Sequence, residues 1–140
     1  MVHALHEAHR VLRTGGLLID ARPDSRRVAP VEHHERGRPR PVGTVNTSAE
    51  SRVDDRLSDR AIARVKREGL FRSRRASGFL HRVTFPDRAG LQSFLDDSVR
   101  LVRRVRWSVD AATRRRWERD TFSVQRPVRY ELLEKITPRG

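Results

Sequence analysis

Apolar residues recur at helical spacing in the first stretch of the chain. Leu5, Ala8 and Leu12 are three and four positions apart, which places them on one helical face and predicts a helix over residues 2–13. A pair of glycines follows, and glycine readily takes the left-handed conformation that closes a helix. The segment LLIDA at 17–21 then has no polar residue before its aspartate. Such a run is typical of a strand that is covered on both faces, as in a parallel sheet.

Two later segments alternate between apolar and polar residues, which is the period of a half-buried strand. The segment 79–85 does so and includes His81, which we expect in the core or at its boundary. The segment 122–136 alternates over a greater length and predicts a long strand, in which Pro127 implies a bulge or an edge.

Helical periodicity returns in the middle of the chain. Apolar residues four apart predict a helix over 51–68, and beside them runs a stripe of four arginines: Arg52, Arg56, Arg60 and Arg64. We interpret the stripe as a solvated flank, because a phosphate-binding face would not need the aspartates that are interleaved with it. Two shorter helices are expected, one from Asp87 through Val99 and one over 110–118.

Residues 28–45 contain two short extended runs around Gly37 and predict a β-hairpin. Pro30, Pro39 and Pro41 cannot donate to a backbone ladder. We therefore expect this hairpin at an edge or on the outside of a sheet.

Composition narrows the class of protein. With 140 residues and 36% hydrophobic content, the chain is expected to form a single domain over 1–140 with one modest core. It has no cysteine, which excludes disulfides and thiolate metal sites and fits a cytoplasmic setting. No apolar run reaches the roughly 18 to 20 residues that span a bilayer, so no membrane partner is expected.

The charge brings nucleic acid into consideration. The formal net charge is +13, and only Lys66 and Lys135 are lysines among 31 basic residues. The arginines are spread along the chain, and aromatic residues make up only 6%, so the interleaved aromatic and basic pattern that stacks single-stranded bases is missing. A solvated basic surface is the favoured interpretation, and a small nucleic-acid-binding module is the alternative.

The spacing of the residues in the sequence indicates neither a set of catalytic residues nor a metal site. His3, His6 and His9 would spread over about 120 degrees of a helix, which is wide for ligands of one metal ion. His33 and His34 lie in the predicted hairpin, and we interpret these histidines as ordinary exposed ones. Gly-rich phosphate loops and nucleophile elbows are also missing from the sequence.

The segment LHEAHRVLRTGGLLID resembles a motif of class I S-adenosylmethionine-dependent methyltransferases. That motif has an acidic residue, Arg-Val-Leu, a basic residue, Pro-Gly-Gly and an apolar strand. The matching residues are Glu7, Arg10, Val11, Leu12, Arg13, Gly15, Gly16 and Leu17 to Ile19, and Thr14 stands where the family commonly has proline. The resemblance implies the fifth strand of that fold and the helix before it. It thus implies an α/β fold for this chain: the C-terminal half of a Rossmann-like methyltransferase sheet, mixed, with helices packed on it and an antiparallel member among its last strands.

In that family the first half of the sheet binds the cofactor, through a Gly-rich turn after the first strand and an acidic residue ending the second. This chain contains neither, so we expect a methyltransferase-like domain that is inactive alone, with no catalytic and no cofactor-binding residue of its own. S-adenosylmethionine is implied only by the resemblance. Substrate would lie at the carboxyl end of the strand at 17–19, which makes Asp20 and Arg22 the expected substrate-binding residues. The alternative for these two residues is an ordinary ion pair in a polar loop.

A strand meant for the middle of a sheet would have one edge unpaired at Leu17–Ile19. An exposed apolar edge invites association unless something covers it. A homo-oligomer, or a partner chain that carries the missing half, is therefore expected at that edge. The chain itself could be a truncated part of a methyltransferase, a split subunit or a derived domain that stands alone.

Overall fold

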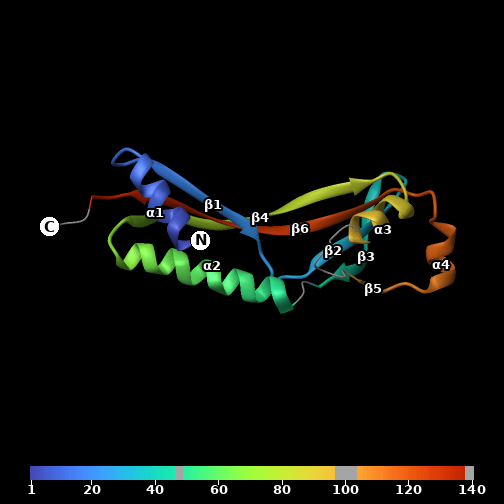
Figure 1. Cartoon of the computed structure of the whole chain (residues 1–140). Coiled ribbons are helices and arrows are strands. Elements are labelled where there is room, and N and C mark those ends of the chain that lie inside the picture. Colours follow the sequence, from blue (N-terminus) through green and yellow to red (C-terminus); the bar gives the residue numbers. More distant parts are fainter. Residues whose placement is uncertain (47–48, 97–103, 138–140) are drawn as a thin grey trace. The chain divides into compact units, whose positions relative to one another are not determined.

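The computed structural model describes residues 1–46, 49–96 and 104–137 (Figure 1). These residues form four helices and six strands, and the class is mixed α/β with an open antiparallel sheet. In chain order the elements are α1 (Val2–Val11), β1 (Leu17–Pro23), β2 (Ala29–Glu35), β3 (Arg38–Val45), α2 (Ala49–Arg67), β4 (Phe71–Phe85), α3 (Arg88–Asp96), β5 (Val105–Trp107), α4 (Ala111–Arg116) and β6 (Phe122–Lys135).

The contacts divide the chain into two compact units. Unit 1 comprises 1–24, 50–79 and 128–140, and unit 2 comprises 25–49 and 80–127. The long strands β4 and β6 contribute residues to both. The single domain expected from composition stays a prediction, and the units are described in turn.

In unit 1, β6 is the central strand. It pairs with β1 in an antiparallel ladder that runs from Leu17 opposite Glu134 to Pro23 opposite Val128. On its other side lies β4, where the Ile136 amide donates to the Leu70 carbonyl at 3.0 Å. Helices α1 and α2 pack on one face of these strands and bury a shared core: Leu5, Ala61, Ile62, Val65, Phe71 and Leu133.

The expectation that both faces of β1 are buried is wrong. Its exposure alternates along the strand, with Leu17 53% and Ile19 65% exposed while Leu18 packs against the core. Its ladder with β6 is also antiparallel rather than parallel. The physical reason is that helices cover only one face of this strand, so hydrophobicity on the other face does not mean burial.

The glycine pair after α1 is required by geometry. Gly15 has φ +76°, and a Cβ on Gly16 would lie 2.7 Å from the Arg13 carbonyl oxygen. The turn also closes onto β6, because the Gly15 amide donates to the Lys135 carbonyl and the Lys135 amide donates to the Gly16 carbonyl. The two glycines therefore join the start of β1 to the end of β6.

In unit 2 the predicted hairpin is confirmed as β2 and β3, joined by a tight turn at Arg36 and Gly37. Strand β2 lies between β3 and β6, whereas β3 pairs with β5 only through Gly43–Val45. The expectation that the hairpin lies at an edge or on the outside of a sheet is wrong, because β2 pairs with β6 and β3 pairs with β5. These outer ladders are short, so within the described residues Pro39 and Pro41 lie in the part of β3 whose one ladder partner is β2.

The core of unit 2 is formed by β2, β3, β6, the end of β4 and α3, and its buried residues are Val31, Val42, Val45, Phe85, Leu91, Leu95, Phe122 and Val124. Helix α3 begins as expected, since Asp87 Oδ1 accepts the Gly90 amide at 2.7 Å. The Asp110 carboxylate caps α4 in the same way through the Thr113 amide. Val99 lies outside the described residues.

The strand predicted at 79–85 exists, but it is the end of the longer β4. The placement of His81 in the core or at its boundary is wrong, because its side chain is exposed. Only Val83 and Phe85 of the alternating set pack on the core of unit 2. The alternation therefore identified the strand correctly but overstated how much of it is covered.

Candidate functional site

Asp20 and Arg22, the expected substrate-binding residues, lie in unit 1 on the half-buried positions of β1. Arg22 Nε donates to Asp20 Oδ2 at 2.9 Å, and Arg22 Nη2 donates to Asp59 Oδ1 of α2 at 3.0 Å. Arg22 Nη1 also reaches the backbone carbonyl of Asp55 at 3.4 Å. The structure thus brings the two residues together and links them to α2.

A second arginine completes this charge cluster. Arg129 of β6 is the cross-strand neighbour of Arg22, and its Nη2 lies 2.8 Å from Asp59 Oδ1 and 4.0 Å from Asp55 Oδ2. The Nε and Nη2 atoms of Arg129 are buried and have no well-directed hydrogen bond among the described residues. Burial raises the pKa of Asp59, but the contacts with Arg129 and Arg22 lower it more, so the net shift is downward.

The cluster can hold α2 against β1 and β6. Arg22 and Arg129 are each only 17% exposed, and their guanidinium groups contact carboxylates of the chain itself. An incoming anion would have to displace those carboxylates. The substrate-binding role of Asp20 and Arg22 stays a prediction.

The outer face of unit 1 is uncovered by the described helices and carries exposed apolar side chains beside an ion-pair cluster of Glu134 with Arg72 and Arg74. Leu17 and Ile19 are more than half exposed on β1, and Phe79 of β4 is 50% exposed beside Tyr130 of β6, with ring centroids 6.5 Å apart. Among the described strands, β1 has β6 as its one ladder partner and ends the strand order of the sheet. Unit 1 therefore presents exposed apolar side chains on β1 next to an open strand edge.

A different kind of site lies in unit 2, where the hairpin meets the segment between α4 and β6. His33 of β2 is only 4% exposed, and its Nε2 lies 2.8 Å from Asp120 Oδ2. Its ring stacks on Trp117 with a centroid distance of 4.0 Å and an interplanar angle of 11°. These three side chains form a fixed wall.

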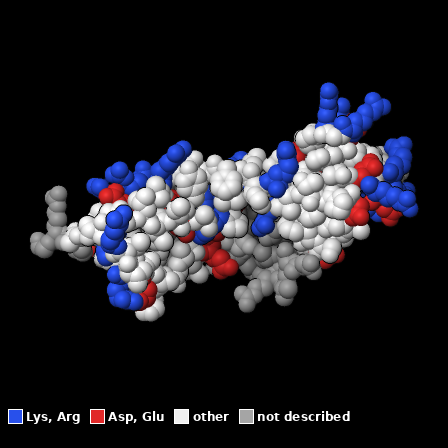
Figure 2. All heavy atoms as spheres, turned by 90° about the horizontal axis from the view of Figure 1, so that it is seen from above, with Lys and Arg blue, Asp and Glu red and all other residues white. Residues whose placement is uncertain are grey.

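That wall borders an open cavity of 570 Å³. The residues that line it are His33, His34, Glu35, Arg36, Arg40, Val42, Trp117, Arg119, Asp120 and Thr121. Arg40 Nε pairs with Glu35 at 3.0 Å, whereas Arg36 and Arg119 have no ion pair within the part of the chain that the structure describes. Figure 2 shows arginine side chains gathered at the end of unit 2 that carries α4, with acidic side chains among them.

The opposite face of the same strands carries a polar network. Ser123 donates to Glu32 Oε2 at 2.7 Å, and His34 Nε2 lies 2.9 Å from Ser123 Oγ. The residue types are those of a nucleophilic triad, but the carboxylate contacts the serine instead of orienting the histidine. Ser123 is also fully buried, so this network connects β2 to β6 and offers no accessible nucleophile.

The interpretation of His33 as an exposed histidine is wrong. The signal that could have placed it is its position two residues after Val31, which puts both side chains on the core face of one strand. The N-terminal histidines have ordinary contacts: His6 pairs with Glu68 at 2.6 Å, and His9 Nε2 lies 3.1 Å from the Ile136 carbonyl oxygen. No group of three or more potential metal ligands occurs among the described residues.

Within the described ranges, none of the helices has the length and apolar character needed to cross a membrane. Comparison with models of protein families, with curated proteins and with solved structures found no match to this chain. The functional proposals below therefore depend on the geometry of the chain and on the resemblance carried by residues 5–20.

Proposed function

We propose that this chain is the C-terminal half of a methyltransferase-like domain and acts only when the missing N-terminal half or a partner chain completes its sheet. The observation that carries the proposal is the open edge of β1 beside the exposed side chains of Leu17 and Ile19. A long apolar strand at an open edge is an association hazard that proteins normally cover. Here that strand is also the one that contains the methyltransferase-like motif.

The direction of the strands in unit 1 supports the proposal. Strand β6 is antiparallel to β1. It is also antiparallel to β4, because Ile136 lies next to Leu70 whereas Val128 lies next to Gly78, so the two strands run in opposite directions. Strands β1 and β4 therefore run in the same direction on either side of an antiparallel last strand. The resemblance implies an antiparallel member among the last strands, and a partner that added parallel strands beyond β1 would produce the mixed, Rossmann-like sheet.

In the proposed complex, the partner binds the cofactor and this chain contributes substrate-binding residues. In the family that this chain resembles, the first half of the domain binds S-adenosylmethionine. Asp20 and Arg22 would then lie near the carboxyl end of a central strand, where open α/β sheets bind their ligands. In this proposal the charge cluster positions those side chains in the isolated chain, and substrate binding follows completion of the sheet.

The test is complementation. The polypeptide encoded immediately upstream would be co-expressed with this chain, and the purified product titrated calorimetrically with S-adenosylmethionine. We expect binding by the complex and none by this chain alone. Ile19→Lys should weaken the complex, whereas Val11→Lys, a similarly exposed change on α1, should not. A complex that forms but binds no cofactor, or an upstream product that does not associate, would contradict the proposal.

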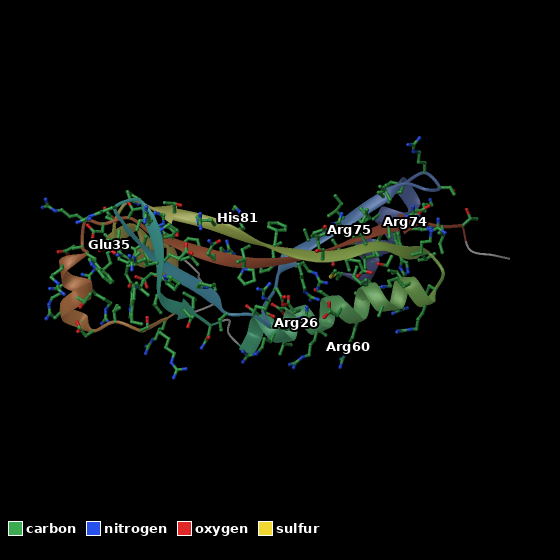
Figure 3. The ribbon with its side chains drawn as sticks, turned by 180° about the vertical axis from the view of Figure 1, so that it is seen from behind. Arg26, Glu35, Arg60, Arg74, Arg75 and His81 are labelled. Atoms are coloured by element: carbon green, nitrogen blue, oxygen red, sulfur yellow. The ribbon has the colours of Figure 1, made fainter. Side chains whose placement is uncertain are left out.

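Nucleic-acid binding is a second candidate, favoured by the basic side chains that project from unit 1. Figure 3 shows Arg60 projecting from α2 on the side away from the strands, and Arg74 and Arg75 projecting from β4. Arg74 pairs with Glu134 at 3.2 Å, which reduces its availability to phosphate. Binding to DNA or RNA that weakens steeply as salt rises would support this candidate. Affinity that is independent of salt, or undetectable at low salt, would exclude it.

A further inference from the structure

We propose that the cavity of unit 2 is a binding site for a phosphate monoester, with Arg36 and Arg119 as the groups that hold the phosphate. This site is separate from the edge of β1 and does not depend on the proposed methyltransferase relationship. Its support comes from the charge of the cavity, the rigidity of its wall and the backbone conformation at Arg36.

The charges of the cavity are unevenly compensated. The Glu35 carboxylate pairs with Arg40, and the Asp120 carboxylate lies against His33. Arg36 and Arg119 line the same cavity without an ion pair among the described residues. Guanidinium groups match phosphate oxygens in both charge and geometry. The Asp120 carboxylate also lines the cavity, but the arginines of the lining outnumber its carboxylates, so the two guanidinium groups without an ion pair fit a phosphate.

The wall of the cavity is held in place by packing. His33 is buried, and it is fixed by Asp120 on one side and by the Trp117 ring on the other. The Asp120 carboxylate also lines the cavity and would repel a bound anion, so attraction depends on Arg36 and Arg119. The 570 Å³ volume exceeds the needs of a bare phosphate ion and is within the usual range of small-molecule sites. The ligand would thus carry an organic group that could lie against Trp117.

The backbone at Arg36 is unusual for an arginine. Arg36 has φ +51°, and Gly37 follows with φ +77°. Positive φ at both central residues is the requirement of a tight hairpin turn that strongly favours Asn-Gly. Arginine is therefore a poorer choice than asparagine for the turn itself. An unfavourable residue at the mouth of a cavity points to a functional reason for its side chain.

The test uses the intact chain and calorimetric titration with adenosine monophosphate, inorganic phosphate and adenosine. We expect adenosine monophosphate to bind, inorganic phosphate to bind more weakly and adenosine not to bind. A single-stranded oligonucleotide without a terminal phosphate is titrated in the same way. Binding of the oligonucleotide in preference to the mononucleotide would reject the monoester and indicate an internal phosphate of a nucleic acid.

Two substitutions make the test specific. Arg36→Asn removes the charge while improving the turn, so the chain should keep or raise its Tm yet bind adenosine monophosphate at least about tenfold more weakly. Arg119→Gln should weaken binding by a similar factor. Arg67→Gln, at an exposed arginine at the end of α2 in unit 1, is the charge-matched control and should leave the affinity unchanged.

The control variant distinguishes a specific site from non-specific attraction of the ligand by the positive charge of the chain. Equal losses in all three variants would show that only the net charge of the chain attracts the ligand, which would overturn the site. Unchanged affinity in Arg36→Asn and Arg119→Gln would overturn it as well. If the unmodified chain does not bind adenosine monophosphate at millimolar concentration, the proposed site is also overturned.

Discussion

Arg22 and Arg129 stand directly opposite each other on β1 and β6, and both guanidinium groups contact the same carboxylate oxygen of Asp59, at 3.0 and 2.8 Å. Like charges in opposite positions of an antiparallel pair normally destabilise it. The carboxylate from α2 offsets that repulsion. Asp59 therefore compensates both guanidinium charges at once, together with Asp20 on Arg22, and adds to the packing that attaches α2.

The first prediction is that Asp59→Asn destabilises the chain. The change keeps the shape of the side chain but leaves two largely buried guanidinium groups facing each other with less compensating charge. Because Asp59 is itself 43% exposed, we expect a loss of about 1–2 kcal/mol in the free energy of unfolding, measured by urea denaturation. Asp54→Asn, at an exposed position on the same helix, is the control. An equal effect of the two substitutions would contradict the proposed role of Asp59.

The second prediction concerns acid. The pKa of Asp59 is lowered in the folded chain, and so is the pKa of Glu134, which accepts hydrogen bonds from Arg72. A carboxylate whose pKa is lower in the folded state stabilises the fold above its unfolded pKa, and that contribution is lost as pH falls through the folded value. Stability should therefore drop as pH falls below about 4. Asp59→Asn should make the drop shallower, and a drop of the same steepness would exclude Asp59 as a contributor.

The third prediction is that the chain alone does not bind S-adenosylmethionine. It lacks the glycine turn and the ribose-binding carboxylate that the methyltransferase resemblance assigns to the other half of the domain. Isothermal titration calorimetry should give no heat of binding. A micromolar dissociation constant for the isolated chain would mean that it holds a complete cofactor site, and the proposed half-domain function would then be wrong.

The fourth prediction is self-association of the isolated chain through β1. A second copy can supply a full set of backbone donors and acceptors to the open edge, and it would cover Leu17 and Ile19. Sedimentation velocity at micromolar concentration should show a dimer. Ile19→Lys should shift it toward monomer, while Val11→Lys, which is 68% exposed on α1, should not. A monomer at all concentrations, with a cooperative thermal transition, would contradict this prediction.

Local sequence signals predicted most elements of the fold. The helix at 51–68, the hairpin at 28–45 and the strand at 122–136 each have a clear period, and the structure places α2, the β2–β3 hairpin and β6 at these positions. Pro39 and Pro41 of the hairpin lie outside the part of β3 that pairs with β5, but the hairpin is not at the sheet edge that its prolines predict. These features depend on residues that are close together in the sequence, which is why the sequence alone predicts them.

The sequence does not predict features that depend on contacts between residues far apart in the chain. The strand β5 is only three residues long and pairs with β3 at Gly43, where a Cβ would lie 2.8 Å from the Arg106 carbonyl oxygen. Nothing in its own sequence has a strand period. The burial of His33 likewise requires Trp117 and Asp120, which come from a segment more than 80 residues later in the chain. In the same way, Asp59 of α2 contacts Arg22 and Arg129, which lie on strands far from it in the sequence.

The central position of β6 in unit 1 has a consequence for synthesis. Ribosomes deliver the chain from its N-terminus, so β1 and β4 emerge well before the strand that forms ladders with both of them. Residues 128–135 are thus the last described strand segment of unit 1 to appear, and until they do, the backbone groups of β1 and β4 lack their native partner. During that interval the unpaired edges and apolar side chains of β1 and β4 are exposed, which is the condition under which nascent chains aggregate.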